Sequence, residues 1–202
     1  MDIKFAWVAS EMKHAYILTV LGVFTRTALA WHVGFSIKQH TVKKVWEAVI
    51  ENHLQPNDTL KKGISIEVRN DNDPRFSAKM VQEFFLKNHL NQVFTQPYKP
   101  QENRHIESFQ AILGRSLEPK YFHNLEQLDV HLALFYMKYN EVRLHGSLAG
   151  LSPKIFGQQW ELGNIKRIVK PKKKIQFKLL IPYHQISGNV DLMEASCLDY
   201  LP

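Results

Sequence analysis

The chain has 202 residues and a mass of 23.6 kDa, which is enough for one domain of ordinary size with an appendage. Hydrophobic residues make up 45% of the sequence and charged residues 22%, proportions that exclude a disordered or collagen-like protein. Lys and Arg number 26 against 19 Asp and Glu, and the resulting net charge of +7 is typical of proteins with a polyanionic partner, although many basic proteins have none.

The sequence shows no sign of a membrane segment or an exported protein. The longest apolar stretch, Ala15 to Phe24, is too short to span a bilayer as a helix, and the N-terminal residues lack the continuous apolar core of a secretory signal. A single cysteine, Cys197, permits neither an internal disulfide nor a cysteine-based metal site. We therefore expect a cytoplasmic protein that does not enter a membrane.

Three β segments open the chain. Residues Ile3 to Val8, Ala15 to Phe24 and Ala28 to Val33 are rich in apolar β-formers and are separated by short polar connections. Such segments predict an antiparallel meander. From Ser36 the hydrophobic period becomes helical, and the predicted helix ends before Pro56.

The middle of the chain alternates strands and helices. Ile64 to Val68 predicts a strand, Met80 to Phe85 a helix and Gln92 to Thr95 a second strand, followed by a proline-containing loop at Gln96 to Glu102. Strand–helix–strand steps of this length favour parallel pairing, so we expect a mixed sheet with helices on its faces.

Two further helices are predicted around Ile106 to Leu113 and Leu125 to Tyr139. Beyond Pro153 the composition becomes basic, and Ile175 to Pro182 then has the pattern of a strand. The sequence therefore predicts an α/β core over residues 1–160 and a small basic C-terminal extension over residues 161–202.

Three acidic residues occupy suggestive positions. Asp2 opens the first strand, Asp71 follows the predicted strand that ends at Val68, and Glu107 lies in the first turns of a helix. Each has an ordinary alternative: a frayed terminus for Asp2, a turn or helix cap for Asp71, and a solvated helix position for Glu107. The predicted topology, however, brings the two strands side by side with the helix above them.

Three carboxylates that lie close together repel one another unless a cation is present. Hard oxygen ligands suit Mg²⁺ or Mn²⁺, and two such ions about 3.5–4 Å apart can activate an attacking oxygen and stabilise a leaving oxygen at phosphorus. The three acids are therefore candidates for a divalent-metal site.

Five motifs in chain order make the pattern specific. Asp71 and Glu107 are separated by 35 residues. The strings around them resemble the second-Asp and Glu motifs of bacterial insertion-sequence transposases with a retroviral-integrase-type catalytic core, the DDE group. The start M-D-I-K-F resembles the first-Asp strand of that family, and V-F-T-R its second-strand motif. The second-Asp motif is Arg69–Phe76, the Glu motif is Gln96–Phe109 and the second-strand motif is Val23–Arg26. The segment Tyr139–Pro153 resembles the family's closing signature.

The resemblance implies a ribonuclease H-like fold, with a three-strand antiparallel meander and two parallel strands flanked by helices. It implies that Asp2, Asp71 and Glu107 are the catalytic residues and that they hold two Mg²⁺ or Mn²⁺ ions. The implied activity is transposition: cleavage of double-stranded DNA at transposon ends and transfer of the freed 3′-hydroxyl to a target phosphodiester. Enzymes of this kind work as multimers, so a homo-oligomer is expected.

The chain departs from the family pattern at several positions. Gly is usual at Asp73, Ser is frequent at Asn70, and Gly is common at Arg104. Asp is common at Gly22. Relatives also carry more of the first strand and an upstream helix-turn-helix region, so a weak or inactive catalyst is expected from the chain as given.

Further residues are candidates for DNA contact. Lys99, Gln101 and Arg104 are placed to touch phosphates, with solvated loop positions as the alternative. Asn103 either orients a carboxylate or caps the helix, and Arg143 and His145 either pack against the core or touch DNA. The remaining candidates form a basic run that either binds phosphates or is a solvated face: Lys166, Arg167, Lys170, Lys172, Lys173 and Lys174.

Three functions remain in competition. The first is a metal-dependent transposase or integrase core. The second is an inactive, truncated remnant that retains some DNA binding. The third is a ribonuclease H-like nuclease without strand transfer, which the closing signature at Tyr139–Pro153 disfavours.

Overall fold

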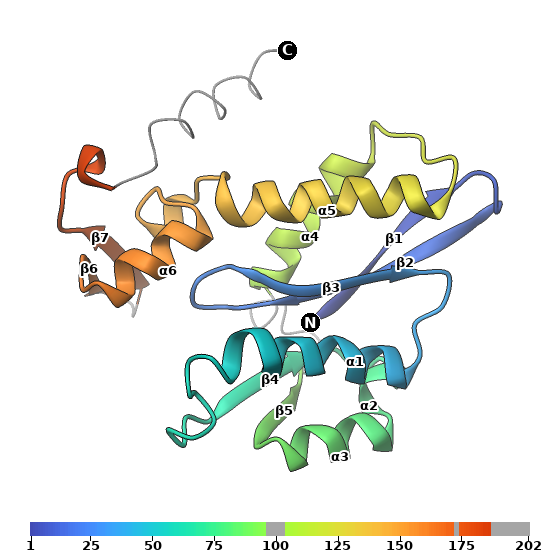
Figure 1. Cartoon of the computed structure of the whole chain (residues 1–202), viewed down its shortest axis with the longest axis horizontal. Helices are drawn as coiled ribbons and strands as arrows, with labels where there is room; N and C mark the ends of the chain where they lie inside the picture. Colours follow the sequence, from blue (N-terminus) through green and yellow to red (C-terminus); the bar gives the residue numbers. More distant parts are fainter. Residues whose placement is uncertain (96–103, 172–173, 187–202) are drawn as a thin grey trace. The chain divides into compact units, whose positions relative to one another are not determined.

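The computed structural model describes residues 1–95, 104–171 and 174–186 (Figure 1). The chain forms two compact units. Unit 1 comprises Met1–Leu21 and Ala28–Leu132, and unit 2 comprises Gly22–Thr27 and Ala133–Pro202. The predicted boundary near residue 160 stays a prediction.

Unit 1 begins with the expected meander. Strands β1 (Asp2–Val8), β2 (Lys13–Leu21) and β3 (Ala28–Gly34) pair antiparallel in the order β1-β2-β3. The prediction that the second strand reaches Phe24 is wrong. The strand ends at Leu21 because residues 22–27 form a turn, which is closed by a 2.8 Å hydrogen bond from the Gly22 N–H to the Thr27 carbonyl.

The amphipathic helix predicted after the meander is confirmed. Helix α1 (Gln39–Val49) continues into a short π-helical segment, η1 (Ile50–Leu54). Its apolar stripe, at helical spacing, is buried, and the helix contacts β3 as well as the two helices that follow it.

The parallel pair is also confirmed. Strand β4 (Ile66–Asn70) and strand β5 (Leu90–Phe94) run parallel, with the register Ile66↔Leu90 to Asn70↔Phe94. Helices α2 (Pro74–Ser77) and α3 (Lys79–Lys87) form the connection between them. The backbone nitrogen of Met1 donates to the Arg69 carbonyl at 2.8 Å, which places the start of β1 beside β4.

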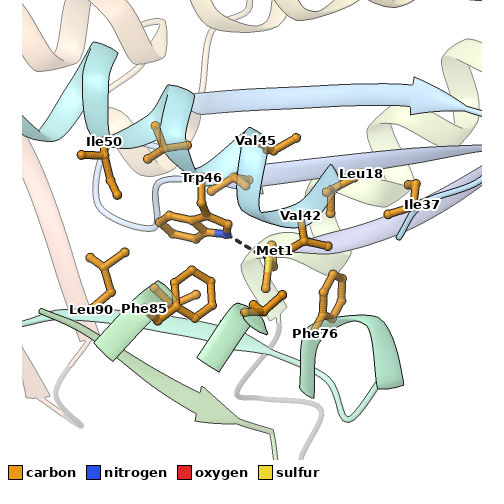
Figure 2. Close-up of a cluster of buried hydrophobic side chains, with 14 residues drawn as sticks. Met1, Leu18, Ile37, Val42, Val45, Trp46, Ile50, Phe76, Phe85 and Leu90 are labelled. Atoms are coloured by element: carbon orange, nitrogen blue, oxygen red, sulfur yellow. Dashed lines mark hydrogen bonds between the residues drawn. The ribbon is translucent and has the colours of Figure 1, made fainter. Parts of the chain in front are cut away.

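The core of unit 1 is built from residues of β1's start, β2, α1, β4, α2, α3 and β5. Figure 2 shows the Met1 and Trp46 side chains meeting at its centre, where Trp46 Nε1 donates to Met1 Sδ at 3.1 Å. Phe76 and Phe85 are among the fully buried rings of this cluster. The predicted strand and helix faces thus pack into one core.

Side chains alternate between the two faces of β1. Met1 joins the core just described and Ile3 packs against it, so Asp2 and Lys4 point to the opposite face. Helix α4 (Arg104–Leu117) contacts β1. The chain then enters α5 (Leu125–Glu141), whose first part belongs to unit 1 and whose second part belongs to unit 2.

Unit 2 contains two elements that the sequence pattern did not predict. Helix α6 (Pro153–Glu161) begins with a Ser152 cap and a proline in its first turn, and strand β6 (Ile165–Lys170) pairs antiparallel with β7 (Lys174–Leu179). Short 3₁₀ turns lie at Gly146–Leu148 and Tyr183–Gln185.

The core of unit 2 combines aliphatic side chains with a group of aromatic rings. Phe156 is fully buried, and its ring centroid lies 4.9 Å from that of Phe177. Phe24, from the turn after β2, packs edge-on against Trp160 at 4.9 Å between ring centroids. The motif V-F-T-R therefore contributes a ring to this cluster rather than extending β2.

Candidate active site

Asp2 lies at the start of β1 and is half-buried. Its Oδ1 accepts a 2.8 Å hydrogen bond from the Ile3 backbone N–H. Burial raises the pKa of Asp2 above its ordinary value, and the negative charge of Asp71 raises it further. The Ile3 N–H, the N-terminal ammonium of Met1 and the Gln110 amide oppose the rise. Asp2 and Asp71 are therefore close enough to repel each other, as the predicted topology requires.

Asp71 follows β4 directly and is exposed to solvent in a well-braced turn. Its Oδ1 accepts from the Asp73 N–H at 3.2 Å. The neighbouring Asn70 is fully buried, and its Nδ2 donates to the Asp71 carbonyl at 2.6 Å. Gln92 on β5 donates to Asn70 Oδ1 at 3.1 Å and to the Phe76 carbonyl at 2.9 Å. These bonds hold the carboxylate of Asp71 at the end of the parallel pair.

Asp73, the unusual second acid of this turn, is paired with a cation. Its Oδ1 accepts from both the backbone N–H and Nε of Arg75 at 2.8 Å, and Oδ2 accepts from Arg75 Nη2 at 2.5 Å. These bonds cap α2, and the guanidinium holds the pKa of Asp73 below its ordinary value. The positive charge of Arg75 thus largely offsets the negative charge of Asp73 and reduces its repulsion of Asp2 and Asp71.

Helix α4 brings a different polar residue to Asp2 from the one the sequence suggested. Glu107 is exposed in the first turn of α4, whereas Gln110, one turn later, is 7% exposed. The Gln110 amide is near enough to lower the pKa of Asp2, yet its Nε2 and Oε1 do not meet hydrogen-bond geometry with any described atom. Its spacing of three residues from Glu107 was the available signal in the sequence.

The described residues contain no group of three or more His, Cys, Asp or Glu side chains that could hold a metal ion. Asp2 and Asp71 lie close enough to interact, but Glu107 does not form a three-acid group with them. The chemistry of the donors nevertheless fits Mg²⁺ or Mn²⁺, because two mutually repelling carboxylates and a buried amide oxygen without a partner are hard oxygen ligands.

The predicted DNA contacts are distributed over both units. Arg104 is exposed at the start of α4, in unit 1. Lys166, Arg167 and Lys170 are exposed on β6 in unit 2, and Lys174 begins β7. The remaining candidates in the two loops lie outside the described residues: Lys99, Gln101, Asn103, Lys172 and Lys173.

The residues after α5 divide into an exposed and a packed member. Arg143 is exposed, whereas the His145 ring lies edge-on to Tyr139 with centroids 5.0 Å apart. Burial, assisted by the charges of Arg143 and Arg26, lowers the pKa of His145 to about 4. His145 is therefore uncharged at neutral pH, which favours the packing alternative for this residue.

Two family models described as integrase core domain match the sequence, one over residues 1–100 and the other over residues 88–153. The chain belongs to the integrase core family. Together the two matches contain all three predicted catalytic acids. Membership indicates enzymes of the polynucleotidyl transferase type and, at the level of the superfamily, DNA integration or transposition.

Solved structures agree on the fold. A chain of the simian T-cell lymphotropic virus intasome matches with a TM-score of 0.59 and 16% identity over 75% of this chain, which spans only 50% of that chain. The Mos1 transposase catalytic domain, solved with Mg and raltegravir, matches with a TM-score of 0.56 and 14% identity over 67% of this chain and 68% of its own.

The HTLV-2 integrase catalytic core domain, solved in a trimeric form with magnesium, gives a TM-score of 0.51 and 15% identity over 75% of this chain and 89% of its own. The likeness confirms the expected ribonuclease H-like α/β fold. A search of curated proteins found no match. None of the helices in the described ranges has the length and apolar character needed to cross a bilayer.

Proposed function

We propose that this integrase core protein cleaves DNA ends and transfers the 3′-hydroxyl strand to a target, using divalent metal held by Asp2, Asp71 and Glu107. The observation that carries the proposal is the mutual repulsion of Asp2, at the start of β1, and Asp71, directly after β4, which the N-terminal ammonium of Met1 only partly offsets. Helix α4, which carries Glu107 and Gln110 one turn apart, contacts β1, the strand that carries Asp2.

The residues have distinct roles in this proposal. Bound Mg²⁺ or Mn²⁺ supplies Lewis acidity that favours deprotonation of the attacking hydroxyl and stabilises charge on the leaving oxygen. Asp2 and Asp71 hold the metal, and Glu107 completes its ligands from α4. In the first step the oxygen of water attacks phosphorus and the 3′-oxygen of the cleaved strand leaves. In the second step that 3′-hydroxyl attacks a target phosphate, and a target 3′-oxygen leaves.

The surroundings of Asp71 suit this role. The Asn70–Gln92 bonds fix the turn so that the carboxylate need not be ordered when metal binds, which reduces the entropic cost of binding. The Asp73–Arg75 pair removes a nearby repulsive charge. The DNA candidates of both units would add sequence-independent phosphate contacts.

A DNA-binding protein without catalytic activity is the second candidate. It is favoured by the exposure of Glu107 and by the lack, among described residues, of a ready three-acid group. Self-association is proposed in either case, since the HTLV-2 integrase core was solved as a trimer.

The test combines calorimetry with nicking of supercoiled plasmid. Asp71→Asn should abolish Mn²⁺ binding and Mn²⁺-dependent nicking, because it removes one of the three charged ligands. Asp58→Asn is the matched control, since Asp58 is a remote surface acid paired with Lys61. Equal Mn²⁺ binding by wild type and Asp71→Asn would refute the metal assignment. Metal binding without nicking or joining would favour the inactive alternative, and nicking without joining would favour a nuclease.

A further inference from the structure

The β6–β7 hairpin separates its residues onto two faces. Its antiparallel register pairs Ile165 with Leu179, Lys166 with Lys178, and Arg167 with Phe177. Successive residues of a strand point to opposite faces, and directly paired residues share a face. The pair Lys166 and Lys178 therefore lies on one face of the hairpin, and the pair Arg167 and Phe177 lies on the other.

The face that carries Phe177 is attached to the core of unit 2. Ile165 is buried there, and Phe177 and Leu179 pack against the cluster that contains Phe156. Arg167 belongs to this same face by register, because it is paired with Phe177, and its side chain is exposed. The alternation of side chains along the strand therefore places the residues of the basic run on two opposite faces of the hairpin.

The opposite face, which we call the lysine face, is defined by Lys166, Lys170 and Lys178. All three side chains are exposed, and no ion pair joins any of them to an acid in the described part of the chain. Gln176 and Ile168 lie between them, and the backbone of Lys174 is paired with Lys170 at the far end. Lys178 stands outside the basic run and was not predicted as a DNA contact.

The charges on this face do not stabilise the hairpin. Like charges directly opposite each other on paired strands are destabilising, and Lys166 and Lys178 are such a pair. A polyanion would relieve this repulsion. Lys166 and Lys170 are four residues apart on one strand, or about 13 Å at roughly 3.3 Å per residue. That span matches a B-DNA groove about 12 Å wide, which admits a two-stranded β ribbon.

We propose that the lysine face binds the phosphate backbone of duplex DNA and positions it without reading its sequence. The proposal rests on the proposed function for the class of its ligand, and it adds Lys178 to the contacts while giving Arg167 a minor part. At the middle of the face Gln176 is polar and Ile168 is half-buried, so neither offers a fully exposed apolar side chain to a lipid surface.

The experiment measures binding of the full chain to a random-sequence 30-base-pair DNA duplex in EDTA across a series of salt concentrations. Lys178→Gln and Arg167→Gln each remove one positive charge from the same hairpin, so they form a matched pair. One lost phosphate contact reduces the slope of log affinity against log salt by about 0.9. We expect that reduction for Lys178→Gln and almost none for Arg167→Gln, and a reduction of about 1.8 for Lys166→Gln/Lys178→Gln.

Equal slope changes for Lys178→Gln and Arg167→Gln would overturn the proposal, because net charge alone would then explain binding. Unchanged slopes in both variants would overturn it as well, and so would tighter binding to a duplex RNA of the same length. The side chains of Lys166, Arg167 and Lys178 are exposed, so no variant should have an unfolding midpoint below the wild-type value. Asp71→Asn tests the proposed catalysis separately: it should bind duplex in EDTA like wild type, whatever its nicking activity.

Discussion

Replacement of Gln110 by methionine should make the metal-free protein more stable. Gln110 is 7% exposed, and neither polar atom of its amide has a hydrogen-bond partner in the described chain. A buried polar group without a partner costs about 1–3 kcal/mol, and methionine has nearly the same length and no amide. The gain for Oε1 is therefore about 2 kcal/mol.

The other amide atom offsets part of this gain. The Gln110 amide lowers the pKa of Asp2, so its loss removes a favourable interaction with that carboxylate, which we set at about 1 kcal/mol. The net expectation for Gln110→Met is about 1 kcal/mol of added stability. For a chain of this size that change raises Tm by about 2–4 °C.

The assay is thermal unfolding in EDTA, with Gln159→Met as the matched control. Gln159 is also 7% exposed, but its Oε1 accepts a 2.8 Å hydrogen bond from Asn164 Nδ2. Its replacement should therefore lower Tm, whereas replacement of Gln110 should raise it. If Gln110→Met lowers Tm by as much as Gln159→Met, the Gln110 amide is satisfied in solution and the reasoning is refuted. In Mn²⁺ the Gln110 variant should also bind metal more weakly.

Three further predictions concern charge, capping and backbone conformation. Asp2→Asn should stabilise the metal-free protein at pH 7, because burial raises the pKa of Asp2 and the fold disfavours the charged carboxylate. The difference in stability should fade below pH 3.8, where the carboxyl is protonated in both folded and unfolded chains. Urea titrations at pH 7 and pH 3 test this, and a gain in stability that is larger at pH 3 would contradict it. Asp73→Ala should lower the free energy of unfolding by about 1–2 kcal/mol at pH 7, since it removes the α2 cap and the ion pair with Arg75. This loss should shrink as pH falls through the lowered pKa of Asp73, and a loss that does not depend on pH would contradict a contribution from the ion pair. Gly150→Ala should lower Tm strongly, because Gly150 has φ +76° and a Cβ would collide with the Tyr183 hydroxyl, and an unchanged Tm would exclude this packing.

The regular elements of unit 1 could be predicted because their patterns are local. Alternating β-formers indicated β1 to β3, and the period of Val42, Val45 and Trp46 indicated α1. The strand–helix–strand order implied the parallel β4–β5 pair, because a helical crossover of this length returns the chain to the end of the sheet at which the first strand began. Asp71 was placed at the end of β4 on the same grounds.

Helix α6 and strand β6 of unit 2 escaped prediction because their burial depends on partners distant in the sequence, whereas the strand predicted at Ile175 to Pro182 corresponds to β7. β6 has four positions with charged or exposed side chains, and only pairing with β7 and packing against Phe156 make it a strand. Phe24 resembles a strand residue locally, yet the aromatic cluster with Trp160 holds it in a turn.

The sequence by itself determined most strands and helices of unit 1 in their order, the acids at their ends and the family, since hydrophobic period and motif spacing are properties of neighbouring residues. Only the tertiary structure decided which side chains meet. It paired Asp73 with Arg75, set Gln110 rather than Glu107 against Asp2, and placed Lys178 on a face from which Arg167 is excluded. These outcomes depend on strand register and on the rotation of α4 against β1, which are fixed by packing of the whole core and carry no local signal.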